Sequence, residues 1–365
     1  MSTPTQTPPS TTTATATIIP PRSWWSKALQ ALLTQRVVLL GVLIILLIVV
    51  MSILDASGAL AGAYNSDYLA AALISAVPLA LLGFAQLIVI ASGRGGIDLS
   101  VGAIVSLTGV VFGLAYGIAE LPLPVAILIT VLAGALCGLV NGILVSYVGF
   151  PALIATLATF YVYRSLALVV SGQRPINSPV IQDFYSAARA IELPLIGGSL
   201  PLIPLGVFTF LIPAVIVIWI AMNKTTWGRR IYGIGTNDTA AIWAGIGTRS
   251  TRASAYVISG VLSSVVAIYT VAQFASSRPD AGTSGNGMAL PAITIAVLGG
   301  VAITGGIGRV AGVLLATLLI VWLNASILLL VPGNEGAQAQ LAALGAVLIF
   351  AALLNGLTKR KYGGI

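Results

Sequence analysis

Long apolar runs separated by short polar stretches make up most of this chain from about residue 37 onward. Most of these runs contain about the 20 residues that a helix needs to cross the hydrocarbon core of a bilayer. The predicted segments are residues 37–54, 68–91, 100–118, 123–148, 151–171, 203–222, 254–274, 290–304, 310–331 and 338–356. The pattern therefore predicts an all-α, polytopic membrane protein with about ten transmembrane helices.

The eighth segment, residues 290–304, is the shortest, and its end is rich in glycine. It contains Gly299 and Gly300 and runs into Thr304–Gly308. Backbone that is interrupted at membrane depth is tolerated only where protein or a cavity covers it. We therefore expect a broken helix in this segment.

A short echo relates two parts of the chain. Gly95–Ile97 precedes the third segment, Gly305–Ile307 precedes the ninth, and Gly102 and Gly312 then occupy the same relative place. Transporters often descend from duplicated halves, but glycine repeats also arise by chance in an apolar sequence. Both explanations stay open at this point.

The composition excludes several other classes of protein. Of the 365 residues, 58% are hydrophobic and 7% are charged, whereas a soluble domain carries about 25% charged residues. There is one cysteine, Cys137, and no histidine. An intrachain disulfide, a His/Cys zinc site and any catalytic machinery that needs imidazole are therefore excluded. No metal site is predicted.

The basic residues gather on one side of the predicted topology. Ten crossings place both termini on the same side, together with Arg22, Lys27, Arg36, Arg94, Lys224, Arg229, Arg230, Arg249, Arg252, Arg309, Lys359, Arg360 and Lys361. Apart from Arg164, which lies within a segment, the remaining basic residues fall on the opposite side: Arg174, Arg189 and Arg278. The positive-inside rule then places both termini in the cytoplasm. The net charge of +8 reflects this topology, so no nucleic-acid partner is predicted.

The same pattern divides the chain into three parts. Residues 1–35 are expected to form a cytoplasmic tail that is disordered at first and ends in a short interfacial helix with Trp24 and Trp25. Residues 36–357 form the transmembrane domain, which includes a long inside loop at 223–253. Residues 358–365 are expected to form a second cytoplasmic tail. Outside, a short amphipathic helix is expected near Val180–Ile191.

The sequence contains no feature that would power transport. The lysines follow Ser26, Asn223, Thr358 and Arg360, so the Gly-Lys-Ser/Thr of a phosphate-binding P-loop is absent. The predicted segments also lack acidic residues near their centres, where proton-driven transporters place Asp, Glu or His. We therefore expect the energy to come from a partner ATPase that binds ATP and Mg, with no cofactor and no enzymatic activity in this chain.

The inside loop contains a stretch that is typical of a short capped helix. Asn237 or Asp238 can accept an amide at the helix start, and Gly245 can end the helix. Its small face and the larger Trp243 suit a groove in another protein. The residues assigned to this docking stretch are Gly235, Asn237, Asp238, Thr239, Ala240, Ala241, Trp243, Ala244, Gly245 and Ile246. The alternative is a positively charged interfacial loop without a docked partner.

Several stretches resemble the ribose-type monosaccharide permeases of ATP-binding cassette (ABC) importers, within the branched-chain amino acid/sugar permease superfamily. The inside loop looks like the family's coupling loop. The run Gly95-Gly96-Ile97-Asp98-Leu99-Ser100-Val101-Gly102, which lies ahead of the third segment, is similar to the signature turn of this family. Pro151–Leu157, Arg164 and Gly172–Ile176 look like its fifth segment. The resemblance spans roughly residues 68 to 356.

This resemblance implies a bundle of the type II ABC importer kind that works by alternating access. It also implies a second permease chain in a homo- or heterodimer, a pair of cytoplasmic ATPase domains and an extracytoplasmic sugar-binding protein. The cargo would be a pentose, a hexose or a polyol.

A neutral sugar needs hydroxyl and amide partners rather than ions, and the predicted segments supply several. The candidate pathway residues are Gln86, Asn141, Thr156, Thr159, Tyr161, Arg164, Thr294 and Asn324. Polar groups in lipid face either a cavity or another helix. Each residue could line a pathway or hold helices together, and the second role is favoured for any one of them.

Two charged residues have structural explanations of their own. Arg164 is expected to pair with Asp183 or Glu192, although it could also snorkel outward or sit at a gate. Asp98 stands where the third segment begins and is expected to cap that helix.

Glycine recurs every fourth residue along one face of the fourth segment, at Gly134, Gly138 and Gly142. Small faces let helices approach closely. We predict tight helix packing there.

Other functions are compatible with the same sequence. A permease of the same superfamily for branched-chain amino acids or nucleosides is the nearest alternative. A self-sufficient secondary transporter or channel belongs to a different class, and it would move solute without an ATPase.

Overall fold

The structure is a computed structural model that describes residues 35–187, 190–191, 201–284 and 287–362. The predicted N-terminal tail with Trp24 and Trp25 lies outside the described residues, and so do Arg189 and Glu192.

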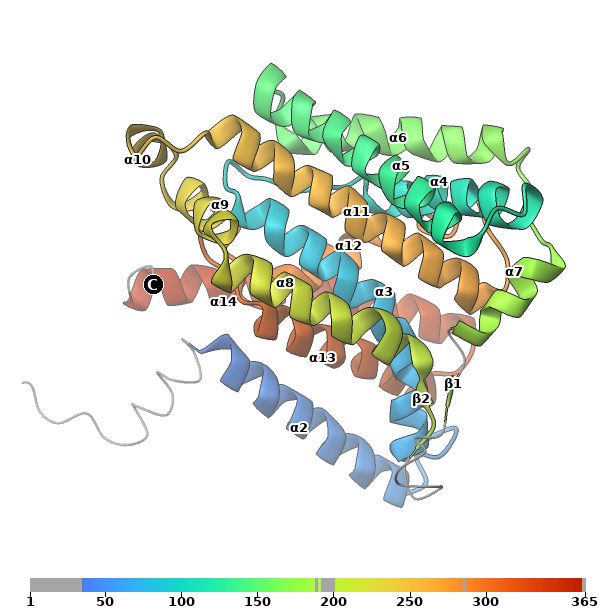
Figure 1. The fold of residues 1–365 in the computed structure, drawn as a ribbon. Coiled ribbons are helices and arrows are strands. Elements are labelled where there is room, and N and C mark those ends of the chain that lie inside the picture. The colour runs from blue at the N-terminus through green and yellow to red at the C-terminus, as the bar shows by residue number, and fades with distance from the viewer. Residues whose placement is uncertain (1–34, 188–189, 192–200, 285–286, 363–365) are drawn as a thin grey trace, which may run out of the picture.

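The described part of the chain is almost entirely helical, which confirms the predicted all-α fold (Figure 1). Nine of its helices are long and apolar enough to cross a membrane. They are α2 (Arg36–Ala56), α3 (Ser66–Ala91), α4 (Val101–Phe112) with η1 (Gly113–Ile118), α5 (Leu123–Ile143) with η2 (Leu144–Val148), α6 (Ala152–Val170), η5 (Val207–Leu211) with α8 (Ile212–Lys224), α11 (Thr248–Phe274), α13 (Val310–Leu330) and α14 (Asn334–Tyr362).

Shorter elements lie between these helices. They are α7 (Pro179–Asp183) with η3 (Phe184–Ala187), the antiparallel strands β1 (Ala190–Ile191) and β2 (Ile203–Pro204), α9 (Thr226–Thr236), α10 (Asp238–Trp243) and α12 (Ala289–Leu298). The amphipathic helix expected near Val180–Ile191 is thus shorter than predicted. The structure also adds α9, which the sequence analysis did not predict.

The eighth predicted segment contains the broken crossing, but the break lies mainly ahead of the helix. The ten residues of α12 rise about 15 Å, which is half of the hydrocarbon core. Before α12, Ser277 pairs with Ile176 at the start of the α7 region. After it, Gly300 packs against the side chain of Arg36 at the start of α2. Residues 275–284 and 287–288 therefore belong to the missing half of the crossing.

The bundle has two distinct ends. The end that contains α10 also holds the first turn of α2 and the last turns of α14, and the other holds α7 and the two strands (Figure 1). We call them the α10 end and the α7 end. Described basic residues gather at the α10 end: Arg36, Arg94, Lys224, Arg229, Arg230, Arg249, Arg252 and Arg309. The first and last described helices thus meet at one end, as ten crossings require.

Helices α3 and α11 form the buried centre, and α5 packs closely against α11. A Cβ added at Gly138 would overlap the carbonyl oxygen of Tyr256, and one at Gly134 would overlap that of Gly260. Gly142 likewise faces the backbone of Ala253. The glycine face of the fourth segment therefore packs as predicted.

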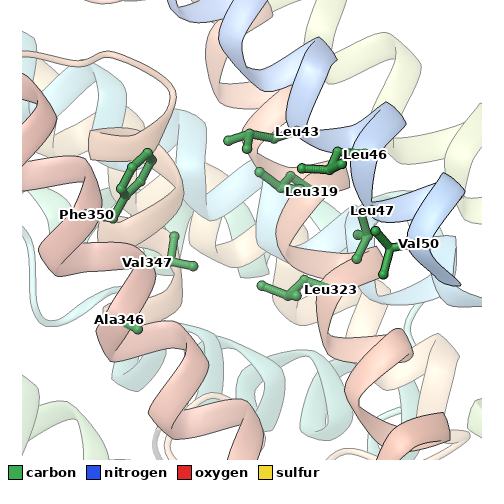
Figure 2. A pocket seen from close by; sticks show the side chains of 9 residues that line it. All are labelled: Leu43, Leu46, Leu47, Val50, Leu319, Leu323, Ala346, Val347 and Phe350. Carbon is green, nitrogen blue, oxygen red and sulfur yellow. The ribbon is translucent and has the colours of Figure 1, made fainter.

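Peripheral helices leave apolar side chains exposed, as lipid or a second chain requires. Between α2, α13 and α14 they frame a groove of about 500 Å³ (Figure 2). Its lining is apolar: Leu43, Leu46, Leu47, Val50, Leu319, Leu323, Ala346, Val347 and Phe350. These side chains offer no hydrogen-bonding partner to a polar cargo.

Two boundaries differ from the predicted ones. Helix α11 begins at Thr248, ahead of the apolar run that starts at 254, and so carries Arg249 and Arg252 in its first turns. Helix α14 continues to Tyr362, past the start of the predicted tail at 358. In both cases, the helical backbone extends beyond the apolar part that the hydrophobic pattern detects.

Candidate functional site

The second half of the turn between α3 and α4, with Asp98 and Ser100 fully buried, is held by a side-chain amide. Gln86 of α3 donates from Nε2 to the carbonyl oxygen of Asp98 at 2.6 Å. The amide of Asp98 donates back to Gln86 Oε1 at 3.3 Å. This two-way pairing satisfies backbone groups that no helix serves, which is required of an irregular turn in an apolar setting.

The Asp98 carboxylate is fully buried, and the chain supplies its donors. Its Oδ1 accepts from the amide of Ser100 at 3.0 Å and from the hydroxyl of Ser100 at 2.6 Å. Its Oδ2 accepts from the hydroxyl of Ser259 on α11 at 2.8 Å. The Ser100 amide immediately precedes α4 at Val101, so Asp98 shapes the turn that leads into the helix, close to the predicted cap.

Helices α5 and α6 complete the arrangement. Asn141 donates from Nδ2 to the Ser100 hydroxyl oxygen at 2.7 Å, and Thr159 donates to Asn141 Oδ1 at 2.7 Å. The amide of Leu99 donates to Thr156 Oγ1 at 3.1 Å. We call this set the signature network: Gln86, Asp98, Ser100, Asn141, Thr156, Thr159 and Ser259. It joins the turn to α3, α5, α6 and α11.

The structure brings together half of the predicted pathway residues and separates the others. Gln86, Asn141, Thr156 and Thr159 belong to the signature network, where they are buried and bonded within the chain. This arrangement suits the role of holding helices together. A direct role for these residues in a pathway stays a prediction.

The remaining pathway candidates lie elsewhere. Thr294 bonds to Leu290 within its own helix at 2.9 Å. Tyr161 is 60% exposed on α6, and Arg164 is also exposed. Asn324 makes a hydrogen bond through its backbone oxygen, which accepts from Gln340 Nε2 at 2.9 Å.

The predicted ion pair of Arg164 is not found among the described residues. Among the described residues there are two ion pairs, and both involve Asp238. Asp183 is described and does not pair with Arg164, whereas Glu192 lies outside the described residues. The exposed position of Arg164, about two turns before the end of α6, suits the snorkelling alternative.

The docking stretch forms a short capped helix, as predicted. Asn237 Oδ1 accepts from the amide of Ala240 at 2.9 Å, and Gly245 follows α10 with a φ of +76°, which suits the left-handed end of a helix. Trp243 is 87% exposed. The predicted small face needs one correction: Ala240 and Ala244 are exposed, but Ala241 is buried against its own chain.

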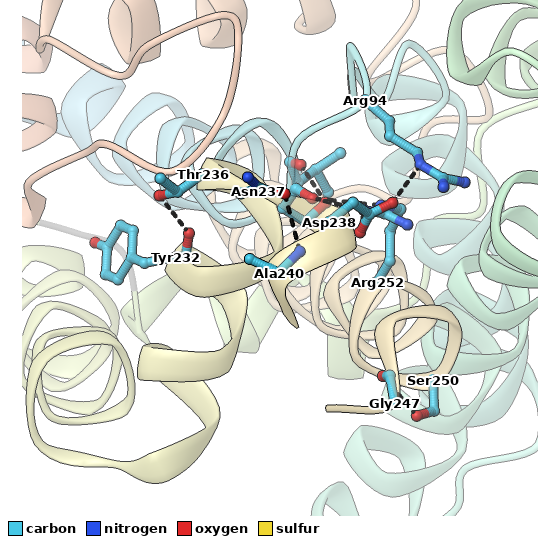
Figure 3. Close-up of polar contacts among 11 residues, drawn as sticks. Arg94, Tyr232, Thr236, Asn237, Asp238, Ala240, Gly247, Ser250 and Arg252 are labelled. Atoms are coloured by element: carbon cyan, nitrogen blue, oxygen red, sulfur yellow. Dashed lines mark hydrogen bonds and ion pairs between the residues drawn. The ribbon is translucent and has the colours of Figure 1, made fainter. Parts of the chain in front are cut away.

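Asp238 anchors α10 to the turn after α3 (Figure 3). Its Oδ2 lies 2.5 Å from Arg94 Nε, and its Oδ1 lies 2.8 Å from Arg252 Nη2. Arg252 is 1% exposed and donates from Nε and Nη2 to the carbonyl oxygen of Ser92, at 3.3 and 3.2 Å. We call Arg94, Asp238 and Arg252 the ion cluster.

Three glycine-rich backbones meet beside the ion cluster. A Cβ at Gly93 would lie 2.8 Å from the Cα of Gly235, and one at Gly235 would overlap the carbonyl oxygen of Ala91. A Cβ at Gly305 would overlap Gly93, and the amide of Gly306 donates to Ala91 at 3.0 Å. The two echoed glycine turns thus pack against each other and against the end of α9, in what we call the glycine junction.

A phenol fastens α9 to the second of these turns. The Tyr232 hydroxyl donates to the carbonyl oxygen of Gly308 at 2.9 Å. Burial raises the pKa of Tyr232 to about 12, because a charged phenolate would lose its solvation. The group therefore remains a neutral hydrogen-bond donor at physiological pH.

Sequence reasoning missed the partners of the predicted residues. Arg94 and Arg252 were used only to predict the orientation in the membrane. Ser259 was not predicted as a site residue, because it lies within an apolar run. Arg252 and Ser259 are seven residues apart, which places them on one face of a helix. That spacing was the available signal. In the described part of the chain, no three acidic or cysteine side chains gather in a way that could hold a metal ion.

A bundle of apolar membrane-spanning helices that holds a buried polar turn and exposes a short capped helix at one end is typical of a polytopic membrane transport protein. Residues 68–352 match the family of permease components of branched-chain amino acid transport systems, and the chain belongs to this family. The predicted family is thereby confirmed.

Curated relatives give the family a closer context. The chain is 35% identical over 257 residues to the autoinducer 2 import system permease protein LsrD of Escherichia coli strain SMS-3-5, covering 70% of this chain and 75% of that protein. The same figures hold for the protein of this name from Shigella flexneri. No solved structure matches the chain significantly.

Proposed function

We propose that this chain is the membrane permease subunit of an ABC importer for a small, neutral, monosaccharide-type solute. The observation that carries the proposal is α10. This exposed helix projects a tryptophan, and the ion pair between Asp238 and Arg94 anchors the helix to the turn that resembles the family's signature. The chain belongs to a family of transport permeases, and its curated relatives are permeases of import systems. Both findings support import as the direction of transport.

The positive charge at the α10 end supports a cytoplasmic location for that end in a bacterial inner membrane. The first and last described helices lie there too, so both termini would be cytoplasmic. The α7 end would then face outward, where a solute-binding protein would dock.

The ATPase would dock on α10. Trp243 is 87% exposed, and tryptophan is one of the residue types that contribute most to binding energy at protein interfaces. The exposed Ala240 and Ala244 leave the surface beside it low enough for close contact with a partner groove. ATP and Mg would be bound by that partner.

A second permease chain would complete the pathway. Helices α5 and α6 expose apolar side chains such as Leu132, Leu153 and Val169. Faces of this kind are buried by lipid or by another membrane subunit. A homodimer or a heterodimer would bury part of this surface.

A neutral cargo fits the charges of the spans better than an amino acid does. Away from the helix ends, the charged residue that the described spans carry is Arg164, and it is exposed on α6. A zwitterion needs partners for both of its charges. The family's description nevertheless names branched-chain amino acids, which makes such a cargo the second candidate.

The two cargoes can be distinguished with the reconstituted importer. The permease, its ATPase and its binding protein are assembled in lipid vesicles, and ATP hydrolysis is measured with a panel of monosaccharides and with leucine. We expect stimulation by at least one monosaccharide and none by leucine. Stimulation by leucine alone would replace the proposed cargo with the second candidate.

A further inference from the structure

The ion cluster joins the proposed docking helix to the buried signature network, and it does so by two separate routes. We propose that Asp238 is a positioning residue that transmits displacement of α10 to the signature network. The inference rests on the proposed docking of an ATPase on α10 and adds the path by which that contact acts on the membrane bundle.

The first route runs through Arg94 and the turn. Arg94 follows α3 and precedes Asp98 by four residues, so the segment that contacts Asp238 also carries the centre of the signature network. Gly93, Arg94 and Gly95 have φ values of +81°, +55° and +64°. A left-handed conformation is unfavourable for arginine and persists where surrounding contacts hold it. The ion pair with Asp238 is such a contact.

The second route runs through Arg252 and α11. The buried guanidinium of Arg252 bridges Asp238 and the Ser92 carbonyl oxygen. Ser259 lies about two turns further along the same face of α11 and donates to Asp98 at 2.8 Å. A displacement of Asp238 therefore acts on Asp98 through a rigid helix as well as through the turn.

Glycine makes the junction beside this cluster stiff rather than loose. Gly93, Gly235 and Gly305 pack backbone against backbone, without side chains between them. Close-packed elements transmit small displacements because they have little free volume to absorb them. The end of α9, which leads into α10 at Asp238, is therefore pressed against both glycine turns.

The test is hydrogen exchange of the full-length permease in lipid nanodiscs, with and without the ABC ATPase subunit of the same importer. In the wild-type chain, adding the ATPase should slow amide exchange in residues 238–246 and also change exchange in residues 93–102. We expect both changes to be about tenfold, within the range of coupling between linked sites. The second segment contacts α10 through Arg94, but residues 97–102 are buried or half-buried in the bundle, so a change in exchange there reports transmission.

The variant Asp238→Asn removes the charge but keeps the size of the side chain, and Asn237 still caps α10. We expect ATPase-induced protection of 238–246 to remain and the change at 93–102 to disappear. Asp238→Glu, which keeps the charge, should restore most of the change at 93–102.

A second pair of variants covers the case in which Asp238→Asn does not fold. Arg94→Gln removes one partner of Asp238 at an exposed position, and Arg249→Gln removes a nearby exposed charge that makes no ion pair with a described residue. We expect Arg94→Gln to reduce the change at 93–102 and Arg249→Gln to leave it as in the wild type.

The outcomes separate the inference from the proposed function. If 238–246 gains no protection in the wild-type chain, α10 is not the docking helix, and both proposals fall. If α10 is protected but Asp238→Asn and Arg94→Gln transmit as well as the wild type, docking stands and the role of Asp238 is overturned.

Discussion

The signature network and α10 contain the two stretches that resemble family motifs, and each departs from what its surroundings favour, in opposite directions. The network buries amide, hydroxyl and carboxylate groups among apolar helices, whereas α10 exposes a tryptophan beyond the bundle. Buried polar groups are tolerated when their hydrogen bonds are made within the chain, and here they are. No such compensation exists for Trp243.

This difference indicates two roles. A satisfied network fixes the positions of the helices that share it and asks nothing of a partner. An exposed large aromatic side chain is a surface that a partner can complete. Mutations in the first region should therefore change the stability of the isolated chain, and mutations in the second should change association without changing stability.

The largest effect is expected where the two regions meet, at the glycine junction. In Gly235→Ala the new Cβ would overlap the Ala91 carbonyl oxygen and the Gly306 amide, so we expect a loss of about 3 kcal/mol in the free energy of unfolding. In the matched control Gly233→Ala the nearest side-chain atom is 4.0 Å away. Thermal unfolding can be followed with a thiol-reactive dye, because the single cysteine, Cys137, is buried.

Equal melting of the two variants in that assay would mean that the three backbones do not pack as described. A lower melting temperature for Gly233→Ala than for Gly235→Ala would lead to the same conclusion.

The next effect concerns the network itself. Asn141→Ala removes the acceptor of Thr159 and a donor to Ser100, and we expect a cost of about 2 kcal/mol from the polar groups left unsatisfied. Asn324→Ala is the matched control, since the backbone of Asn324 makes its hydrogen bond with Gln340. The control should cost less than about 1 kcal/mol. Similar losses in both variants would remove the distinction between network and periphery.

The third prediction concerns α10. Trp243→Ala should leave the melting temperature of the isolated permease unchanged, because the side chain is 87% exposed. Its affinity for the ATPase should fall by about 2 kcal/mol, roughly 30-fold, if the residue is a hot spot. Trp219→Ala on α8 is the control, since that residue lies on a membrane span. Titration of nanodisc-bound permease with the ATPase gives both affinities, and an unchanged value for Trp243→Ala would contradict docking at this helix.

The smallest effect distinguishes two neighbouring alanines. Ala244→Arg adds a bulky charge to the exposed side of the docking surface and should weaken ATPase association alone. Ala241 is 5% exposed, so Ala241→Arg should lower the melting temperature as well. If both variants melt like the wild type, the assigned orientation of α10 is wrong.

The hydrophobic pattern predicted the membrane helices well because about 20 apolar residues in a row suit few other structures. It failed where the chain is helical but not apolar. Helix α11 begins in the polar turn at Thr248, and α9 contains too few apolar residues to register as a span. The half-length α12 was detected as a short segment, but the rest of this crossing involves residues 275–284 and 287–288, which carry no clear hydrophobic pattern of their own.

The site was predicted in its parts but not in its connections. The turn from Gly95 to Gly102 and the capped helix at Asn237 were identifiable from local chemistry. The contacts of Asp238 with Arg94 and Arg252 join residues from three separate segments. Pairings of this kind depend on how the helices pack, and local sequence does not specify that.

The central claim is that this chain is powered by a partner that contacts α10. The most direct test is solute uptake by lipid vesicles that contain the permease and the binding protein, measured with and without the ATPase at equal ATP. The account predicts accumulation against a gradient only when the ATPase is present. Accumulation of the solute by vesicles that lack the ATPase would contradict it.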